Sequence, residues 1–348
     1  MPSPDLLSLR ALNRALLSRQ LLLRPEPMPE DGAHNGTARA GRVIETVEHL
    51  VGLQAQAPFP PYYGLWSRLA GFRPDDLAGL LLSRQVVRIA LMRGTIHLVS
   101  ARDCLLLRPL VQPALDRGLG TLLSRQLAGV DTAELAAVGR VLVEERPLTF
   151  SELGAALSAQ WPQHPPAALA QGVRALVPLV RLVTRYLAAF GPASIRDAQA
   201  WSGLTRLREV ADRLRPGLRV FRDEQGTELF DLPDAPRPDP GTPAPVRLVA
   251  EFDNIALSHA DRARIISEPN RQRMFTRNGI FPGTVLVDGF GAGMWKISLS
   301  RAAAALTIEL FRPLGPRDRD AVTDEGRRLL AFAAPDSEAH DIRFAPLA

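Results

Sequence analysis

The stretch VIETVEHLVGLQAQAPFPP (residues 43–61) sets the local fold of the first part of this chain. Its apolar residues recur at helical spacing, which predicts an amphipathic helix over Val43–Leu53. Prolines follow at positions 58, 60 and 61. Because proline lacks an N–H and disfavours helix in the residue before it, the helix should not continue past Ala57. The chain therefore leaves the helix at the two glutamines of LQAQ.

Gln54 and Gln56 stand two positions apart in this exit segment. Residues i and i+2 point to opposite sides of a helix but to the same side of an extended chain, so the two amides can share one cleft. Each amide offers an acceptor and donors but cannot take up a proton, so the pair could orient a water or a base edge. Alternatively, the two side chains only satisfy backbone groups at a helix end. Spacing alone leaves both interpretations open.

Four runs, in order along most of the chain, resemble the AlkZ/YcaQ family of bacterial winged-helix DNA glycosylases. They are LQAQ (residues 53–56), GLWSRL (64–69), LMRGTIHLV (91–99) and DNIALSHADR (253–262). In that family a Gln-x-Gln or Gln-x-Asp motif carries catalysis, so the resemblance implies that Gln54 and Gln56 are the catalytic pair. It also implies excision of bulky alkylated guanines, unhooking of interstrand crosslinks, and self-resistance to a genotoxic natural product.

The composition is that of a globular protein with several folded units. The chain has 348 residues, of which 46% are hydrophobic, enough for two or more ordinary cores. Its formal charge of +5 is carried by arginine, since Lys296 is the only lysine. Arginine forks suit phosphates and guanine edges, which favours DNA binding. A general bias toward arginine codons explains the ratio of arginine to lysine equally well.

The sequence argues against several classes of site and location. Cys104 is the only cysteine, which excludes an internal disulfide and argues against a cysteine-ligated zinc or iron–sulfur cluster. We expect no metal and no cofactor. No apolar run reaches membrane-spanning length and no secretory pattern opens the chain, so we expect a cytoplasmic, nucleoid-associated monomer without a membrane partner. The resemblance implies that its partner is double-stranded DNA carrying alkylated guanine.

Helices followed by a short strand pair recur three times, which is typical of winged helices and predicts an α+β fold. In the first copy, alternating apolar residues around Arg93-Gly94 predict a hairpin, the wing, over Val86–Val99. Helical hairpins beside any short sheet would give a similar pattern. The other expected elements are helices over Leu6–Leu23, Gly64–Leu69, Asp75–Leu82, Ala101–Asp116, Ala133–Glu145, Ala167–Leu176, Ser194–Trp201 and Leu204–Leu214, a loop over Arg24–Gly41, and strand pairs over Leu179–Leu187 and Leu218–Leu232.

A proline-rich stretch, residues 233–246, predicts a semi-rigid linker. Beyond it, short β-rich runs predict a small β-barrel or a curled sheet, and an amphipathic helix is expected over Arg317–Ala334. The resemblance implies the same plan, with tandem winged helices and a barrel around a concave DNA channel. The β-rich runs are Val246–Glu251, Arg264–Ile266, Gly283–Val287, Met294–Leu299 and Leu306–Leu310. The predicted units are winged helices at 1–120, 121–190 and 191–232, the linker at 233–246, and the barrel domain at 247–348.

Two segments carry candidate DNA contacts. Arg93, Thr95 and His97 lie on the predicted first wing, and wings often reach the minor groove or the backbone. A single histidine on a strand also fits a structural role. The second segment is a loop whose arginines and histidine favour phosphate contact, although Asp253 and Asp261 could hold it as a structural turn. Its candidate contacts are Ser258, His259, Arg262 and Arg264.

The chemistry of glutamine limits the mechanism. A neutral amide is no acid or base at physiological pH, so the leaving group must already be activated. Guanine alkylated at N7 is cationic and leaves without an acid. We expect the pair to orient the attacking water while the carbonyl dipoles face positive charge on the sugar. Without an obvious lysine nucleophile, the site should be monofunctional. Two alternatives stay open: a winged-helix regulator without activity, and a protein that sequesters adducts without turnover.

Overall fold

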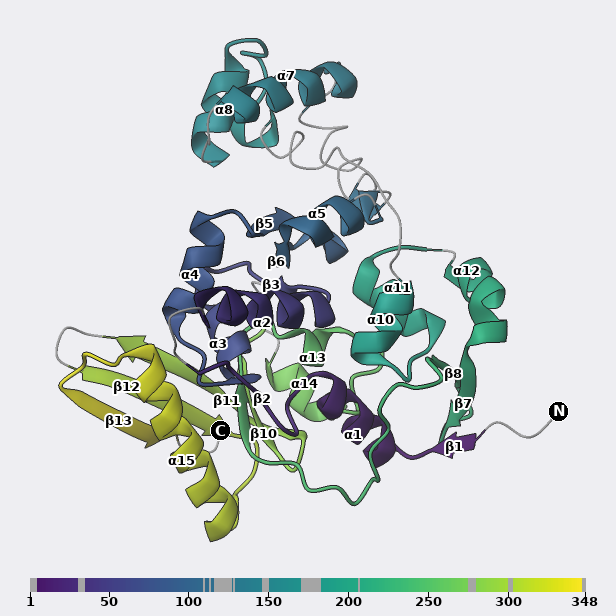
Figure 1. Cartoon of the computed structure of the whole chain (residues 1–348), viewed down its shortest axis with the longest axis vertical. Helices are drawn as coiled ribbons and strands as arrows, with labels where there is room; N and C mark the ends of the chain where they lie inside the picture. The colour runs from purple at the N-terminus through teal and green to yellow at the C-terminus, as the bar shows by residue number, and fades with distance from the viewer. Residues whose placement is uncertain are drawn as a thin grey trace.

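The computed structural model describes residues 5–30, 35–108, 110–112, 114–115, 127, 129–145, 150–169, 183–205, 207–274, 280–299 and 303–345. Helices alternate with mostly antiparallel strand pairs along the chain, so the predicted mixed α+β class is confirmed. Figure 1 shows a C-terminal sheet with its helix α15 at one side, and α7 and α8 apart at the top of the view.

The N-terminal part is built on a three-stranded sheet of order β3-β6-β5. The predicted hairpin is confirmed, since β5 (Val86–Ala90) and β6 (Ile96–Ser100) form an antiparallel pair joined by a turn at Met92–Gly94. On the other side of β6 lies β3 (Leu53–Gln54). The surrounding helices are α2 (Asn35–His49), α3 (Pro60–Trp66), α4 (Pro74–Leu82) and α5 (Ala101–Leu107).

Helix α2 ends at His49, four residues earlier than the sequence predicts. Val51 and Gly52 have positive φ angles, 56° and 88°, and these turn the chain into β3. Glycine is needed at position 52 because a Cβ there would lie 2.7 Å from Val99 Cγ1. The extended exit that the sequence predicts is therefore present, but a tight turn separates it from the helix.

The prolines after the glutamines begin a helix. Pro60 and Pro61 occupy the first turn of α3, where a missing N–H costs no hydrogen bond. The predicted loop over Arg24–Gly41 is also more ordered than expected. Within it, β2 (Glu26–Pro27) pairs with β4 (Leu69–Ala70), and α2 already begins at Asn35.

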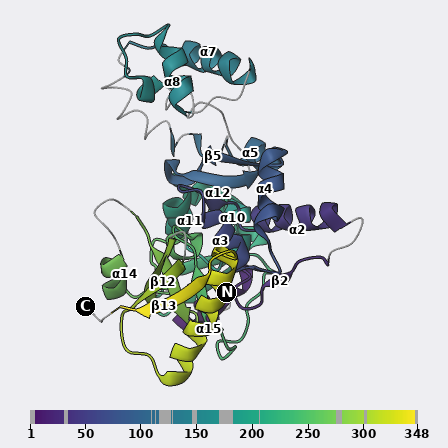
Figure 2. The same cartoon turned by 90° about the vertical axis from the view of Figure 1, so that its left-hand side faces the viewer.

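Helices α7 (Thr132–Glu145) and α8 (Phe150–Ser158) share a small core of their own, with Leu135, Leu157 and Trp161 buried in it. Both views show this pair apart from the other described elements (Figures 1 and 2). Of the helix predicted over Ala167–Leu176, residues 167–169 are helical, and residues 170–176 lie outside the described ranges.

The strand pair predicted over Leu179–Leu187 is wrong where the structure describes it. Helix α10 (Val183–Phe190) covers residues 183–187, and residues 179–182 lie outside the described ranges. Val183, Tyr186 and Phe190 are buried at helical spacing in the main core, and this packing favours a helix over a strand.

The third predicted unit has α11 (Ile195–Ser202), α12 (Leu207–Leu214) and the expected hairpin of β7 (Arg219–Asp223) and β8 (Glu228–Asp231). The first strand of the chain, β1 (Asp5–Leu7), pairs in parallel with β7.

Because residues 5–7 are extended, the helix predicted from Leu6 begins only at Leu9, as α1 (Leu9–Arg19). Arg19 forms a fully buried ion pair with Asp231 at 2.7 Å, which fixes α1 to the hairpin of the third unit. The proline-rich linker also packs on α1. Arg10 donates to Pro240 O at 2.8 Å and Arg14 to Thr242 O at 2.6 Å.

The C-terminal part is a five-stranded sheet of order β13-β12-β11-β10-β9. Helix α15 (Pro316–Ala333), close to its predicted range, connects β12 to β13 and packs on the sheet, so these two strands run parallel. Within the described residues the sheet stays open with β9 and β13 at its edges, and the predicted closed barrel is not found. The strands are β9 (Arg247–Val249), β10 (Gly283–Val287), β11 (Phe290–Leu299), β12 (Ala303–Leu310) and β13 (Ala339–Phe344).

The segment between the linker and β10 contains two short helices, α13 (Asn254–Leu257) and α14 (Glu268–Met274). The strand predicted over Arg264–Ile266 is wrong, because these residues form a turn between the helices. Ile265 and Ile266 are buried in the main core, so their β-branched side chains reflect packing rather than strand pairing.

Candidate active site

The two glutamines occupy different environments at the end of β3. Gln54 is buried and pairs with His97 of β6, whereas the side chain of Gln56 is exposed. Between them, the backbone N–H of Ala55 donates to Ile96 O at 2.8 Å. Arg88, on β5, donates to the carbonyl oxygen of Ala55 at 2.6 Å. The wing therefore holds the backbone of the motif from two sides.

Both glutamine carbonyl oxygens accept hydrogen bonds within the protein. Arg93 Nη2 donates to Gln54 Oε1 at 2.9 Å, and the backbone N–H of Ile96 donates to Gln56 Oε1 at 3.1 Å. Because each partner can only donate, these contacts decide which end of each amide is the oxygen. Each carbonyl oxygen keeps a second lone pair that a water molecule can use.

Arg93 lies at the meeting point of three segments. Its guanidinium also donates to Trp201 O at 2.9 Å, in the last turn of α11, and lies 3.5 Å from Asn254 Oδ1. Burial lowers the pKa of Arg93 to about 10, with the nearby charge of Arg262 as the second cause. The side chain therefore stays charged at neutral pH.

A buried ion pair positions Asn254 near this group. Arg68 of the GLWSRL run forms two 2.8 Å bonds with the carboxylate of Asp253, which in turn caps α13 by accepting from the N–H of Ile255. Asn254 Nδ2 donates to Gly52 O at 3.3 Å, beside the turn that leads into the motif. Sequence reasoning missed Arg68 and Asn254 as site residues, although both lie in the runs that carry the family resemblance.

His97 and Thr95 both make hydrogen-bonding contacts within the protein, and Thr95 is half-buried. His97 is completely buried, and its Nδ1 lies 3.1 Å from Thr95 O. His97 Nε2 has no hydrogen-bond partner among the described residues. Burial lowers the pKa of His97 to about 3, helped by the charge of Arg93, so the ring is neutral at physiological pH. The hydroxyl of Thr95 donates to Met92 O at 3.0 Å. A DNA contact by either side chain stays a prediction.

The predicted contacts around residue 260 lie mostly inside the fold. Ser258 and His259 are buried, with His259 Nε2 3.1 Å from Phe190 O, and burial lowers the pKa of His259 to about 3. Arg264 is buried and donates to Pro192 O at 2.7 Å. These three side chains support the scaffold in this conformation and leave little surface for a phosphate. Arg262 is half-buried and stays a candidate.

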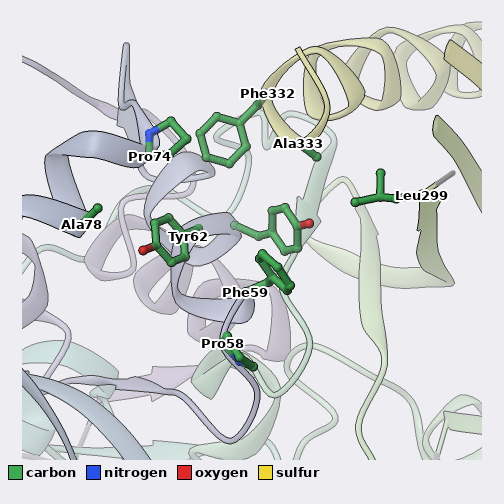
Figure 3. A pocket seen from close by; sticks show the side chains of 9 residues that line it. Pro58, Phe59, Tyr62, Pro74, Ala78, Leu299, Phe332 and Ala333 are labelled. Carbon is green, nitrogen blue, oxygen red and sulfur yellow. The ribbon is translucent and has the colours of Figure 1, made fainter. Parts of the chain in front are cut away.

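An apolar cavity of about 370 Å³ is lined on one side by residues that follow the motif in the chain and on the other side by residues of β11 and α15. Phe59, three residues after Gln56, is 62% exposed at this cavity, and Tyr62 follows it on α3. Figure 3 shows Phe59 and Tyr62 lining the cavity together with Phe332 of α15 and Leu299 of β11. Burial raises the pKa of Tyr62, so its hydroxyl is neutral.

The model of the AlkZ-like DNA glycosylase family matches residues 47–182 and 179–332 of this chain. The chain belongs to the AlkZ-like DNA glycosylases. Its fold is similar to that of the Streptomyces sahachiroi DNA glycosylase AlkZ, with a TM-score of 0.77, covering 97% of this chain and 100% of that chain at 17% sequence identity. No curated protein matches the sequence. This AlkZ-like glycosylase is thus an enzyme that acts on DNA.

Several arginines of this AlkZ-like glycosylase are structural. Arg14, Arg19 and Arg68 have completely buried side chains and each pairs with an aspartate. Because each of these pairs is neutral, these three arginines add nothing to the net charge of +5, which the remaining residues carry. Within the described ranges, no group of three or more His, Cys, Asp or Glu side chains could hold a metal ion, and no helix is long and apolar enough to cross a membrane.

Proposed function

We propose that this AlkZ-like glycosylase hydrolyses the N-glycosidic bond of bulky, cationic N7-alkylguanine adducts in double-stranded DNA, interstrand crosslinks among them. Gln54 and Gln56 are its catalytic pair. The observation that carries the proposal is the fixed orientation of both amides, whose carbonyl oxygens accept from Arg93 and from the Ile96 backbone. The proposed biological role is self-resistance to a genotoxic natural product, carried out by a monomer in the cytoplasm.

The proposed reaction needs no proton donor. A water oxygen attacks C1′ of the sugar, the bond from C1′ to the guanine nitrogen breaks, and its electron pair neutralises the cationic base. The water loses a proton to solvent and an abasic site remains. The second lone pairs of the glutamine oxygens accept hydrogen bonds from the water, and their dipoles face the positive charge on C1′. Neither group titrates, so the leaving group has to be activated in advance.

The apolar cavity supports a bulky substrate. It opens beside Phe59, three residues from Gln56, and its volume of about 370 Å³ lies within the range of small-molecule sites. A large N7 substituent could lie there while the guanine stays near the glutamines. The winged-helix units and the C-terminal sheet are proposed to form the channel that holds the duplex.

Base release from a panel of duplexes tests this proposal. The panel contains N7-methylguanine, an N7-guanine adduct with an aromatic substituent, and uracil, each assayed under multiple turnover with and without a chelator. We expect release of both cationic guanines, no release of uracil, and no effect of the chelator. Efficient uracil release or loss of activity on chelation would overturn the mechanism. Tight binding of adducts without turnover would support sequestration instead.

A further inference from the structure

We propose that Arg93 is a positioning residue that holds Gln54 in its working orientation and joins the first wing to the third unit, rather than a phosphate contact. This inference rests on the catalytic role proposed for Gln54. The sequence placed Arg93 on a DNA-facing wing, but its guanidinium is turned toward the interior of the site, where it reaches three other segments of the chain.

The described partners of Arg93 are all neutral oxygens. Nη2 donates to Gln54 Oε1 at 2.9 Å and lies 3.5 Å from Asn254 Oδ1, while Nη1 donates to Trp201 O at 2.9 Å. The carbonyl of Trp201 lies in the last turn of α11, where backbone oxygens have no partner within the helix and a cation is favourable. The planar fork thus spans two elements at once, which the point charge of a lysine cannot reproduce.

The backbone of Arg93 is adapted to this position. Its φ angle is 57°, in the left-handed region that arginine rarely adopts, and Gly94 follows at 73°. The end of α11 packs closely on this turn, because a Cβ at Gly203 would lie 3.4 Å from Arg93 Cα. Strained residues of this kind persist where surrounding contacts fix them, and they are frequent at active sites.

Arg93 acts through geometry rather than through its charge. Positive charge develops on the reacting sugar, and a cation beside it repels that charge. The charge of Arg93 therefore cannot stabilise the transition state directly. The hydrogen bond to Gln54 Oε1 instead prevents the amide from rotating and exchanging its oxygen for its NH₂ group. Without that bond, Gln54 can present donors where the attacking water needs an acceptor.

Single-turnover excision of N7-methylguanine and duplex binding at several salt concentrations test the proposal. The variants are Arg93→Ala, Arg93→Lys, Gln54→Ala and the double variant Arg93→Ala/Gln54→Ala. We expect Arg93→Ala to slow excision at saturating enzyme by at least about tenfold, with little change in the slope of binding against salt. Arg93→Lys should excise almost as slowly as Arg93→Ala. Added methylguanidinium should restore part of the rate of Arg93→Ala.

The double variant separates positioning from an independent role. Because both residues act through one amide, the double variant should be no slower than Gln54→Ala alone. Arg84, which also has a positive φ angle, 58°, but is exposed, provides the matched control, and Arg84→Ala should excise at the normal rate. If Arg93→Ala does not fold, the excision rate of Arg93→Lys, compared with those of wild type and of Gln54→Ala, tests the positioning role instead.

Two outcomes would overturn the inference: additive losses in the double variant, or normal excision by Arg93→Ala. If the salt slope of Arg93→Ala also falls by about 0.9 while the rate is normal, Arg93 is a phosphate contact instead. The failure of the proposed function gives a different result. If Gln54→Ala itself excises at the wild-type rate, the catalytic role of Gln54 is wrong, whatever Arg93 does.

Discussion

Arg68 and Asp253 form a buried, two-pronged ion pair with both nitrogen–oxygen distances at 2.8 Å, although 185 residues separate them in the chain. The side chain of Arg68 is completely buried and that of Asp253 nearly so. This pair joins the segment after the Gln-x-Gln motif to α13, which carries Asn254 to the site. Two sequence runs that carry the family resemblance therefore meet in space beside the glutamines.

Breaking this pair should destabilise the protein strongly. Asp253→Asn leaves the charge of Arg68 buried without its counterion, and such losses lower the free energy of unfolding by about 3–5 kcal/mol. Denaturant unfolding measures the change. Asp324→Asn is the control, because Asp324 pairs with Arg327 on the surface and an exposed pair contributes about 0–1 kcal/mol. Equal effects of the two substitutions would contradict the structural role assigned to Arg68 and Asp253.

Removing either catalytic amide should abolish the chemistry while leaving DNA binding nearly unchanged. Gln54→Ala or Gln56→Ala should slow single-turnover excision by about a hundredfold or more, as the loss of a fixed polar group at a reacting centre does. Duplex affinity should change little because neither side chain is charged. Gln85→Ala, at an exposed glutamine just before β5, should excise normally. Near-normal rates in both motif variants would show that the catalytic groups lie elsewhere.

Acid should destabilise the fold through His97 and His259. Burial, aided by Arg93 and Arg264 respectively, lowers the pKa of each ring to about 3, whereas a histidine in an unfolded chain titrates near about 6.5. Between these values the unfolded state binds more protons. The free energy of unfolding should therefore fall as the pH drops below about 6.5, by up to about 1.4 kcal/mol per pH unit for each ring.

Denaturant unfolding between pH about 7.5 and about 5 measures this dependence. His97→Gln cannot titrate and should make the dependence shallower, whereas His340→Gln, at an exposed position, should leave it unchanged. An unaltered pH dependence in His97→Gln would mean that this ring titrates alike in the folded and unfolded protein, so that burial does not lower its pKa.

The salt dependence of binding should distinguish surface from buried arginines around residue 260. Arg262→Glu should reduce the slope of log affinity against log salt by about 0.9 for each DNA phosphate that the variant no longer neutralises. Arg264→Ala should instead lower the melting temperature, because Arg264 is buried and donates to Pro192 O at 2.7 Å. A flat salt response of the wild-type protein would show that this surface does not follow the DNA backbone.

The apolar cavity should matter only for large substituents. Phe59→Ala removes an exposed ring from its rim and should slow excision of an aromatic N7-guanine adduct while leaving N7-methylguanine unaffected. Leu105→Ala, which truncates a more exposed apolar residue on α5, is the control. Equal losses on both substrates would indicate that Phe59 supports the motif rather than the substituent.

Local physics made several elements predictable from the sequence. Alternating apolar residues predicted the hairpin of β5 and β6, and an amphipathic pattern predicted α15 within one residue at each end. The exit of the chain from a helix near Gln54 was also predictable, because proline restricts the backbone whatever surrounds it. These features depend on neighbours within a few positions.

Tertiary structure alone decided the rest. Residues 183–187 are compatible with a strand by composition, but burial of Tyr186 in the main core selects a helix. The sequence predicts Arg93 and Arg264 to be surface cations. Their partners, Trp201 O and Pro192 O, lie 108 and 72 residues away along the chain. A charged side chain turns inward only where distant oxygens satisfy its donors, and no local pattern encodes where those oxygens will be.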